Sequence, residues 1–298
     1  MADHIRAALP GARGPFRARA EWALSVIVEA LGRELIVVDG AADIVYATEA
    51  PESGLWIPAQ PDAQDFFRGE QAFPGTSVHR HRGLTLLWEP VQPAAAIPGD
   101  ILASAFYLLA RWDELRVPER DRFGRLPLSA SAFANIAGLD LEDPPVEGYI
   151  AAIGAGLGIA PPATWSVYLT HDIDRLRRRT ARGIASEVRA GGLGRLGSLA
   201  RRDPWNNIPD LLWTSGRRGL APTVFFIGRN AHELDGSPRA VYERERADLV
   251  RAVQTAGGEV GLHGAFASSE DRDALAEELA ILRAEAGTVE GVRFHYLR

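Results

Sequence analysis

The chain contains no cysteine, which excludes disulfide bonds, thiolate zinc sites and cysteine nucleophiles. Any metal ion must therefore be held by histidine, aspartate or glutamate. Lysine is absent too, and all 33 basic residues are arginine, a bias for which we have no functional account. The most hydrophobic run, "ILASAFYLLARW", is bounded by Asp100 and Asp113, and the first residues lack the apolar core of a signal peptide. These absences predict a cytoplasmic chain without a membrane span.

The composition is that of a globular protein. The 298 residues are 46% hydrophobic and 24% charged, enough for one large domain or two ordinary ones. The formal net charge of −6 means that attraction to a nucleic acid would have to come from a local patch. The one dense basic cluster has no interleaved aromatic residues and no recognised binding motif around it, so a solvated helix face is favoured and no nucleic-acid partner is predicted. That cluster consists of Arg175, Arg177, Arg178, Arg179 and Arg182.

The first half of the chain predicts an α+β domain over residues 1–162. Apolar residues recur at helical spacing over 16–31, where Gly32 provides a stop, and again over 100–115. Between these helices lie the strand-like runs "ELIVVDG", "ADIVYAT", "SGLWIPA" and "LTLLWEP". Four prolines between Asp143 and Ala163 flank a small-residue helix and indicate a domain boundary near residue 162. The role of this domain stays open.

The second half, residues 163–298, changes to a strand–helix alternation. Strands are predicted over 165–170, 222–228, 258–263 and 291–294, with a long insertion from 182 to 219 after the first. Helices are predicted over 239–256 and from Ser268, whose hydroxyl is expected to cap the turn that contains Asp271. This order implies a parallel sheet, and function in such sheets gathers at the carboxyl ends of the strands.

The candidate functional residues lie at these strand ends. Asp172 and Asp174 follow the first strand, His263 ends the third, and Arg293, His295 and Tyr296 accompany the fourth. One aspartate could hold a metal while the other takes a proton. Each residue also has a purely structural interpretation, as a helix cap, an ion-pair partner, a core histidine or a surface group. The residues alone therefore leave a metal site and an ordinary charged strand end open.

Four segments taken in order resemble a known family. "VYLTHDID", "PTVFFIG", "EVGLHGAFAS" and "GVRFHYLR" are similar to the first three motifs of the polysaccharide deacetylases, also called the NodB-homology fold. The nearest subgroup has a "THDVD" motif and an uncharacterised N-terminal domain, which "DILASAFYLLARWDELRVPERDRFGRLPLS" resembles. The resemblance implies a distorted (β/α) barrel that removes acetyl groups from N-acetylated sugars or related small amides with a divalent metal such as zinc.

The resemblance also implies roles for individual residues. Asp172 matches the catalytic base, and Arg293 and Tyr296 match the arginine that orients the base and the aromatic residue of the third motif. Asp174 and His263 match two metal ligands. The second histidine of the family's H-x-x-x-H motif would fall at Ala267, so we expect His295 or a group outside this sequence to complete the metal site.

The length is the second departure from the family. Residues 163–298 provide about four strands where the family's barrel has roughly seven, so we expect a partial, truncated barrel with little or no turnover. The alternative function is a catalytically dead carbohydrate-binding or assembly module on the same fold. The identity of the sugar and of the metal, and the oligomeric state, are left open by the sequence.

Overall fold

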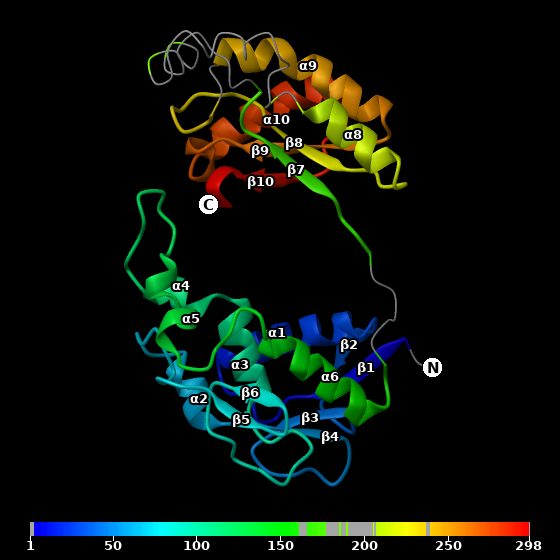
Figure 1. The fold of residues 1–298 in the computed structure, drawn as a ribbon. Helices are drawn as coiled ribbons and strands as arrows, with labels where there is room; N and C mark the ends of the chain where they lie inside the picture. Colours follow the sequence, from blue (N-terminus) through cyan, green and yellow to red (C-terminus); the bar gives the residue numbers. More distant parts are fainter. Residues whose placement is uncertain are drawn as a thin grey trace. The chain divides into compact units, whose positions relative to one another are not determined.

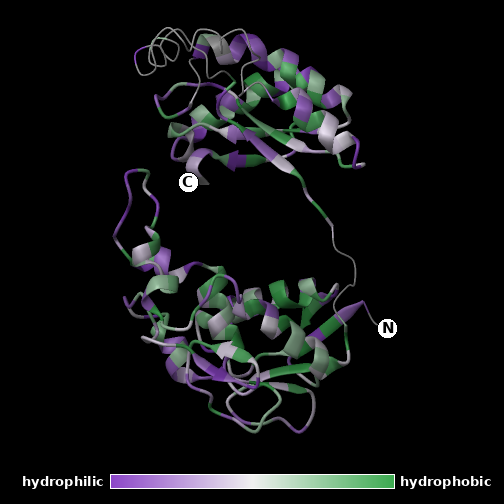
Figure 2. Cartoon of the chain, in the orientation of Figure 1, coloured by the Kyte–Doolittle hydropathy of each residue, from purple (hydrophilic) through white to green (hydrophobic). Residues whose placement is uncertain are grey.

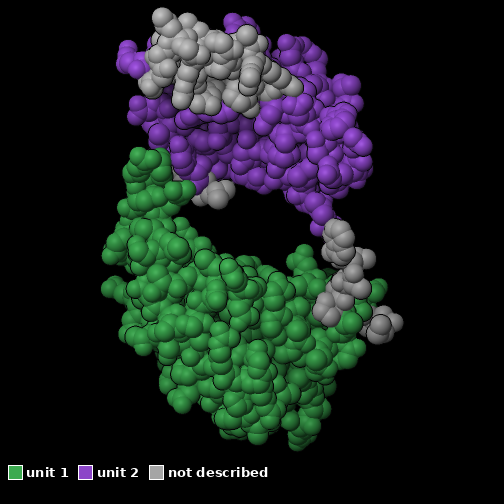
Figure 3. Space-filling view, in the orientation of Figure 1, with its two compact units in different colours: residues 1–165 green, residues 166–298 purple. Residues whose placement is uncertain are grey.

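The computed structural model describes residues 3–160, 166–176, 185, 189, 205, 207–236 and 239–297. The chain forms two compact units, Met1–Trp165 and Ser166–Arg298 (Figure 3). Both units are mixed α/β structures built on parallel strands. Among the described residues, no helix combines the length and the apolar character needed to cross a membrane.

Unit 1 contains a four-stranded parallel sheet in the order β2-β1-β3-β4 (Figure 1). Its strands are β1 (His4–Ala8), β2 (Glu34–Val37), β3 (Ile44–Ala47) and β4 (Leu55–Pro58). A separate antiparallel hairpin joins β5 (His79–His81) to β6 (Leu84–Leu86). The strand β1 was not predicted, because its sequence HIRAA carries little β-branched or aromatic character.

The helices of unit 1 surround one hydrophobic core. α1 (Phe16–Ala30) buries its Ala- and Leu-rich face, whereas Trp22 is 43% exposed. The remaining helices are α2 (Pro61–Phe66), α3 (Ile101–Leu109), α4 (Trp112–Arg116), the 3₁₀ turn η1 (Leu128–Ala130), α5 (Ala132–Asn135) and α6 (Pro145–Leu157).

The single helix predicted over 100–115 is wrong, because the structure breaks it into α3 and α4. Arg111 adopts the left-handed conformation (φ 50°, ψ 53°) and ends the first helix. The break brings the Trp112 ring edge-on to Phe67, with ring centroids 5.0 Å apart, and Trp112 is 3% exposed. Burial of this ring against other aromatic side chains offsets the backbone strain.

Unit 2 contains a second parallel sheet in the order β10-β9-β8-β7, which curls into half of a barrel. The strands are β7 (Thr170–Ile173), β8 (Thr223–Ile227), β9 (Glu259–Gly264) and β10 (Val292–Phe294). The predicted parallel order of these strands is confirmed. The helices whose full length is described are α8 (Ile208–Gly216), α9 (Arg239–Thr255) and α10 (Arg272–Ala286), with the 3₁₀ turns η3 (Ala267–Ser269) and η4 (His295–Leu297).

The core of unit 2 lies between the sheet and its helices. Val250 and Val253 of α9 and Leu282 of α10 belong to one buried cluster with strand residues such as Phe226 and Leu262. Figure 2 shows hydrophilic residues in purple and hydrophobic residues in green interleaved along α9 and α10, as expected for helices with one face on a sheet. The strands of unit 2 therefore pack on a hydrophobic core, which fixes the positions of their ends.

Two boundaries in unit 2 differ from the sequence prediction. The first strand begins at Thr170, the residue that pairs with Thr223 at the start of β8. Asp172 consequently lies inside β7, whereas Asp174 follows it. The cap of α10 is Asp271, whose carboxylate accepts from the backbone N–H groups of Asp273 and Ala274. The Ser268 hydroxyl instead donates to the carbonyl of Ala265 inside η3.

Most of the arginine cluster and of the insertion over 182–219 lies outside the described residues. Arg175 is described, and its guanidinium lies 5.3 Å from the centre of the Trp205 ring. At the other end of the insertion, α8 is described and packs its Ile208 and Leu212 into the core of unit 2.

Candidate metal centre

Three strand ends of unit 2 bring together Asp174, His263 and His295. Asp174 follows β7, His263 lies near the end of β9, and His295 follows β10. Asp174 Oδ1 is 3.0 Å from His263 Nε2 and 3.3 Å from His295 Nδ1. The two imidazole nitrogens are 3.0 Å apart. Both histidines are buried, and Asp174 is partly exposed, so the cluster has one open side.

The outer nitrogen of each imidazole is held by a backbone carbonyl. His263 Nδ1 lies 2.9 Å from the carbonyl oxygen of Arg293, and His295 Nε2 lies 2.8 Å from that of Leu234. A carbonyl only accepts, so each of these outer nitrogens must carry a proton. In the neutral rings, the inner nitrogens then present lone pairs to each other and to Asp174. Three acceptors at this distance repel one another unless a proton or a cation lies among them.

The electrostatics of the cluster favour positive charge. Asp174 Oδ1 is buried and has no hydrogen bond of acceptable geometry, although both imidazole nitrogens lie close to it. Burial alone raises the pKa of Asp174, but the two imidazoles outweigh it and hold this pKa well below its usual value. Burial lowers the pKa of His295, but Asp174 and the Leu234 carbonyl outweigh it and raise this pKa. The cluster therefore holds Asp174 as a carboxylate, which favours the binding of a cation.

The geometry of the three ligand atoms fits a divalent metal. Ligands about 2.1 Å from a tetrahedral zinc ion are separated by roughly 3.4 Å, which is close to the three separations in this cluster. Two imidazoles and one carboxylate on one face also form a donor set that leaves further positions open. The group Asp174–His263–His295 could therefore hold a metal ion. The hypothesis that His295 completes the ligand set has this geometry in its favour.

The second aspartate, Asp172, pairs with Arg293 beside this cluster. Arg293 donates from one guanidinium nitrogen to Asp172 Oδ1 at 2.9 Å and to the Thr170 hydroxyl at 3.1 Å. Its guanidinium lies over the Phe225 ring, 4.6 Å from the ring centre. The stacking and the two hydrogen bonds restrict the arginine, and the arginine in turn orients Asp172.

A hollow of about 460 Å³ opens in front of both aspartates. Asp172, Asp174 and Arg293 line one part of it, and polar and aromatic side chains from the α8 region line another. The latter include Trp205 and Asn207. This space is large enough for a small ligand, and it gives a substrate direct access to the carboxylates.

Tyr296 and Ala267 belong neither to the group of three candidate ligands nor to the lining of the hollow. Tyr296 has a left-handed backbone (φ 61°), and its ring packs 4.3 Å from the His295 ring and 5.7 Å from that of Phe266. It is not among the described residues that line the hollow. Ala267 lies exposed in η3, and its side chain has no atom that could bind a metal. The third residue of the group that could hold a metal is therefore His295 after β10, not the residue at the position of the missing histidine.

Sequence reasoning missed Asp235, which holds the loop that contacts His295. Its fully buried carboxylate accepts from the backbone N–H groups of Ala231 and His232 on one oxygen and of Phe266 on the other, at 2.7–2.9 Å. These bonds fix the loop that presents the Leu234 carbonyl to His295. The Asp-Gly pair at 235–236 signals a turn, but nothing in it indicates that this turn meets the end of β10, which is not a neighbour of β8 in the sheet.

The match found by comparison with known protein families lies within unit 1. A family model described as "Family of unknown function (DUF7033)" matches residues 18–157. No curated protein and no solved structure matches the chain.

Proposed function

We propose that unit 2 is a metal-dependent amide hydrolase of the polysaccharide deacetylase type, which removes acetyl groups from N-acetylated sugars or related small amides. The observation that carries the proposal is the adjacency of two different carboxylates at one hollow. Asp174 belongs to the histidine cluster, whereas Asp172 is held by Arg293 outside it. Such a division leaves one carboxylate to bind a metal and the other to move a proton.

The residues of this chain suit amide hydrolysis. A divalent metal held by Asp174, His263 and His295 would supply Lewis-acid activation of water and of the amide carbonyl. Asp172, whose side chain is 31% exposed, would accept the proton of the attacking water. Arg293 would hold the Asp172 carboxylate in place at the hollow, because its guanidinium donates to this carboxylate and is itself fixed over the Phe225 ring. Trp205 and Asn207 would contact the sugar.

The test is acetate release from N-acetylglucosamine oligomers by the purified chain, with and without added Zn²⁺. We expect slow release by the wild-type chain, because its barrel is partial. Asp172→Asn should lower that slow rate by about a hundredfold or more with unchanged metal content, since general base catalysis contributes typically 10²–10⁴-fold. Asp248→Asn, which removes an exposed carboxylate of α9, serves as the matched control and should keep the wild-type rate.

The same experiment separates the hydrolase from the alternative binding module. If the oligomers bind with and without metal and no acetate is released under any metal, unit 2 is a binding module and the hydrolase proposal fails. Equal rates in wild type and Asp172→Asn would reject the role of Asp172 specifically. Ala267 in place of the motif histidine is the feature that makes this comparison necessary.

A further inference from the structure

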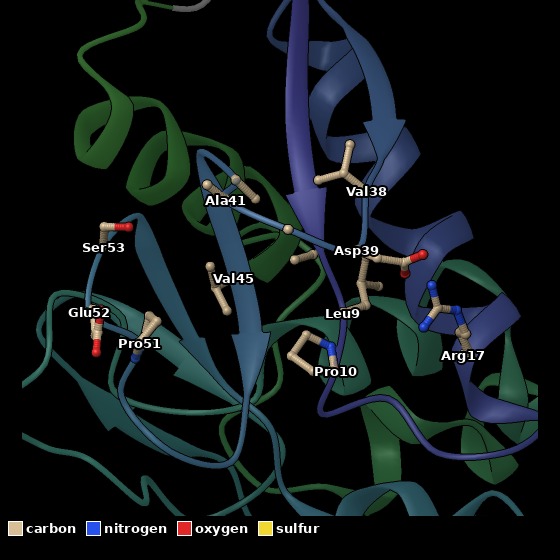
Figure 4. A pocket seen from close by; sticks show the side chains of 13 residues that line it. Leu9, Pro10, Arg17, Val38, Asp39, Ala41, Val45, Pro51, Glu52 and Ser53 are labelled. Carbon is tan, nitrogen blue, oxygen red and sulfur yellow. The ribbon is translucent and has the colours of Figure 1, made fainter.

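Unit 1 contains a cavity of its own, of about 350 Å³ (Figure 4). Ala8, Leu9 and Pro10 line it at the end of β1, and the segment 38–42 lines it after β2. β1 pairs with β2 on one side and with β3 on the other. The strand order of the sheet therefore reverses direction at β1. In open parallel sheets, ligands bind in the crevice outside the carboxyl ends of the strands where the strand order reverses.

The lining combines an apolar floor with a polar rim. The floor consists of Ala8, Leu9, Pro10, Val38, Ala41, Ala42, Val45 and Pro51. In Figure 4, Arg17 and Asp39 lie on one side of the cavity, and Glu52 and Ser53 lie on the other. Within the described part of the chain, these four side chains make no hydrogen bond or ion pair, so the fold does not use them to hold itself together. A small number of polar groups around an apolar surface is typical of a small-molecule site.

The charge around the cavity and the use of nearby backbone donors both disfavour a phosphate ligand. The rim contains two carboxylates, Asp39 and Glu52, and one guanidinium, Arg17, so its formal net charge is −1. In the loop from β1 to α1, the backbone N–H groups of Gly11 and Ala12 already donate to the carbonyls of Tyr46 and Leu9. The backbone N–H of Arg13 in this loop already donates to the Gln64 side chain at 2.9 Å. The donors that would bind phosphate are therefore committed elsewhere.

We propose that this cavity binds a compact organic cation, namely a protonated amine with an apolar body. The apolar body covers Leu9, Pro10 and Val45, and the ammonium group lies between the carboxylates with Glu52 and Ser53 as its main partners. Arg17 shares the wall with Asp39 and repels the cation, so it acts as a selectivity element. All of these residues lie in unit 1, so the proposal is independent of the hydrolase function of unit 2.

Three probes of nearly equal shape test which ligand charge the cavity prefers: cyclohexylamine, cyclohexanol and cyclohexanecarboxylate. We expect cyclohexylamine to bind the full-length protein with a Kd in the millimolar range, as a ligand this small allows. Methyl resonances of Leu9, Val38 and Val45 should shift on titration. Cyclohexanol should bind more weakly, and cyclohexanecarboxylate should cause no saturable shift.

Rim variants identify the groups responsible. Glu52→Gln and Asp39→Asn should each weaken cyclohexylamine binding about three- to fivefold, as expected for exposed ion pairs. Arg17→Gln should strengthen it by removing the repulsion. The matched control Glu29→Gln, which removes an exposed carboxylate at the far end of α1, should leave it unchanged. Equal binding of the three probes, no saturable shift with cyclohexylamine, or wild-type affinity in both acidic variants would overturn the proposal.

Discussion

His263 Nε2 and His295 Nδ1 lie 3.0 Å apart, and the other nitrogen of each ring meets a backbone carbonyl. The two residues are separated by 32 positions in the chain and meet because β9 and β10 are adjacent and parallel. The carbonyls fix the orientation of both rings before any cation binds. Preorganised ligands of this kind lose little freedom on binding, which favours tight metal binding.

The first prediction concerns metal content. Purified wild type should bind about one Zn²⁺ per chain, and His263→Ala and His295→Ala should each retain less than roughly a tenth of it after dialysis, because two remaining ligands are too few for a stable site. Elemental analysis of the dialysed proteins measures this. His79→Ala in the β5 strand is the control and should bind metal as wild type does. Stoichiometric metal in His295→Ala would show that His295 is not a ligand.

The second prediction concerns Asp235. Asp235→Asn replaces one carboxylate oxygen by an amide that faces a backbone donor, so the loop carrying Leu234 should shift and Zn²⁺ affinity should fall roughly tenfold, as for other groups that orient ligands. Competition with a chelating dye measures the affinity. Asp271→Asn, at the cap of α10, is the control for a general loss of stability. If both variants lose affinity in proportion to their melting temperatures, Asp235 has no specific effect on the site.

The third prediction concerns the pH dependence of stability. Asp100 is buried and accepts from Tyr46 Oη, Gln60 N and Ala103 N at 2.6–2.9 Å. Burial outweighs these hydrogen bonds and raises the pKa of Asp100 from 3.8 to about 6. The folded state therefore holds the proton more tightly than the unfolded state, so this contribution is complete below pH 3.8 and is lost as the pH rises through 6.

Urea unfolding at several pH values tests this sign. Between pH 4 and 7, the free energy of unfolding of wild type should fall by about 2 kcal/mol relative to that of Asp100→Asn, which cannot titrate. The variant should be less stable at every pH, because its amide group faces the Gln60 donor. A constant difference between the two proteins across this range would show that Asp100 is not protonated in the folded state near pH 4.

The fourth prediction concerns the turn between β5 and β6. Arg82 and Gly83 both have positive φ, 49° and 78°, which is the geometry of a two-residue hairpin turn that prefers Asn-Gly. Arg82→Asn should raise the free energy of unfolding by about 0.5–1 kcal/mol, because asparagine tolerates this conformation better than arginine. Thermal unfolding measures the change.

Gly83→Ala provides the matched control for this turn. A Cβ at Gly83 meets nothing within 4 Å, so any loss of stability comes from the backbone conformation alone. We expect a loss of about 1 kcal/mol. An unchanged melting temperature in both variants would mean that the positive φ values in this hairpin carry no measurable strain.

The predicted alternation of strands and helices in the second half was confirmed for a local reason. Runs such as "PTVFFIG" and the Leu stripe of α10 carry hydrophobic patterns that suit a buried strand and a one-sided helix whatever surrounds them. The sequence predictions were wrong where contacts with residues far along the chain determine the local structure. The start of β7 follows from its pairing with β8, and the break at Arg111 follows from the burial of Trp112 among distant aromatic rings.

By itself, the sequence determined the donor chemistry: without cysteine, only histidine and carboxylate ligands are possible, and the parallel strand order assigns their side chains to one rim of a sheet. The tertiary structure alone decided that His295 joins Asp174 and His263, because ligand distances depend on how neighbouring strands are aligned. It alone also placed Asp235 in the loop that contacts His295 and formed the cavity of unit 1. Both arise from residues far apart in the chain, whose meeting no local pattern encodes.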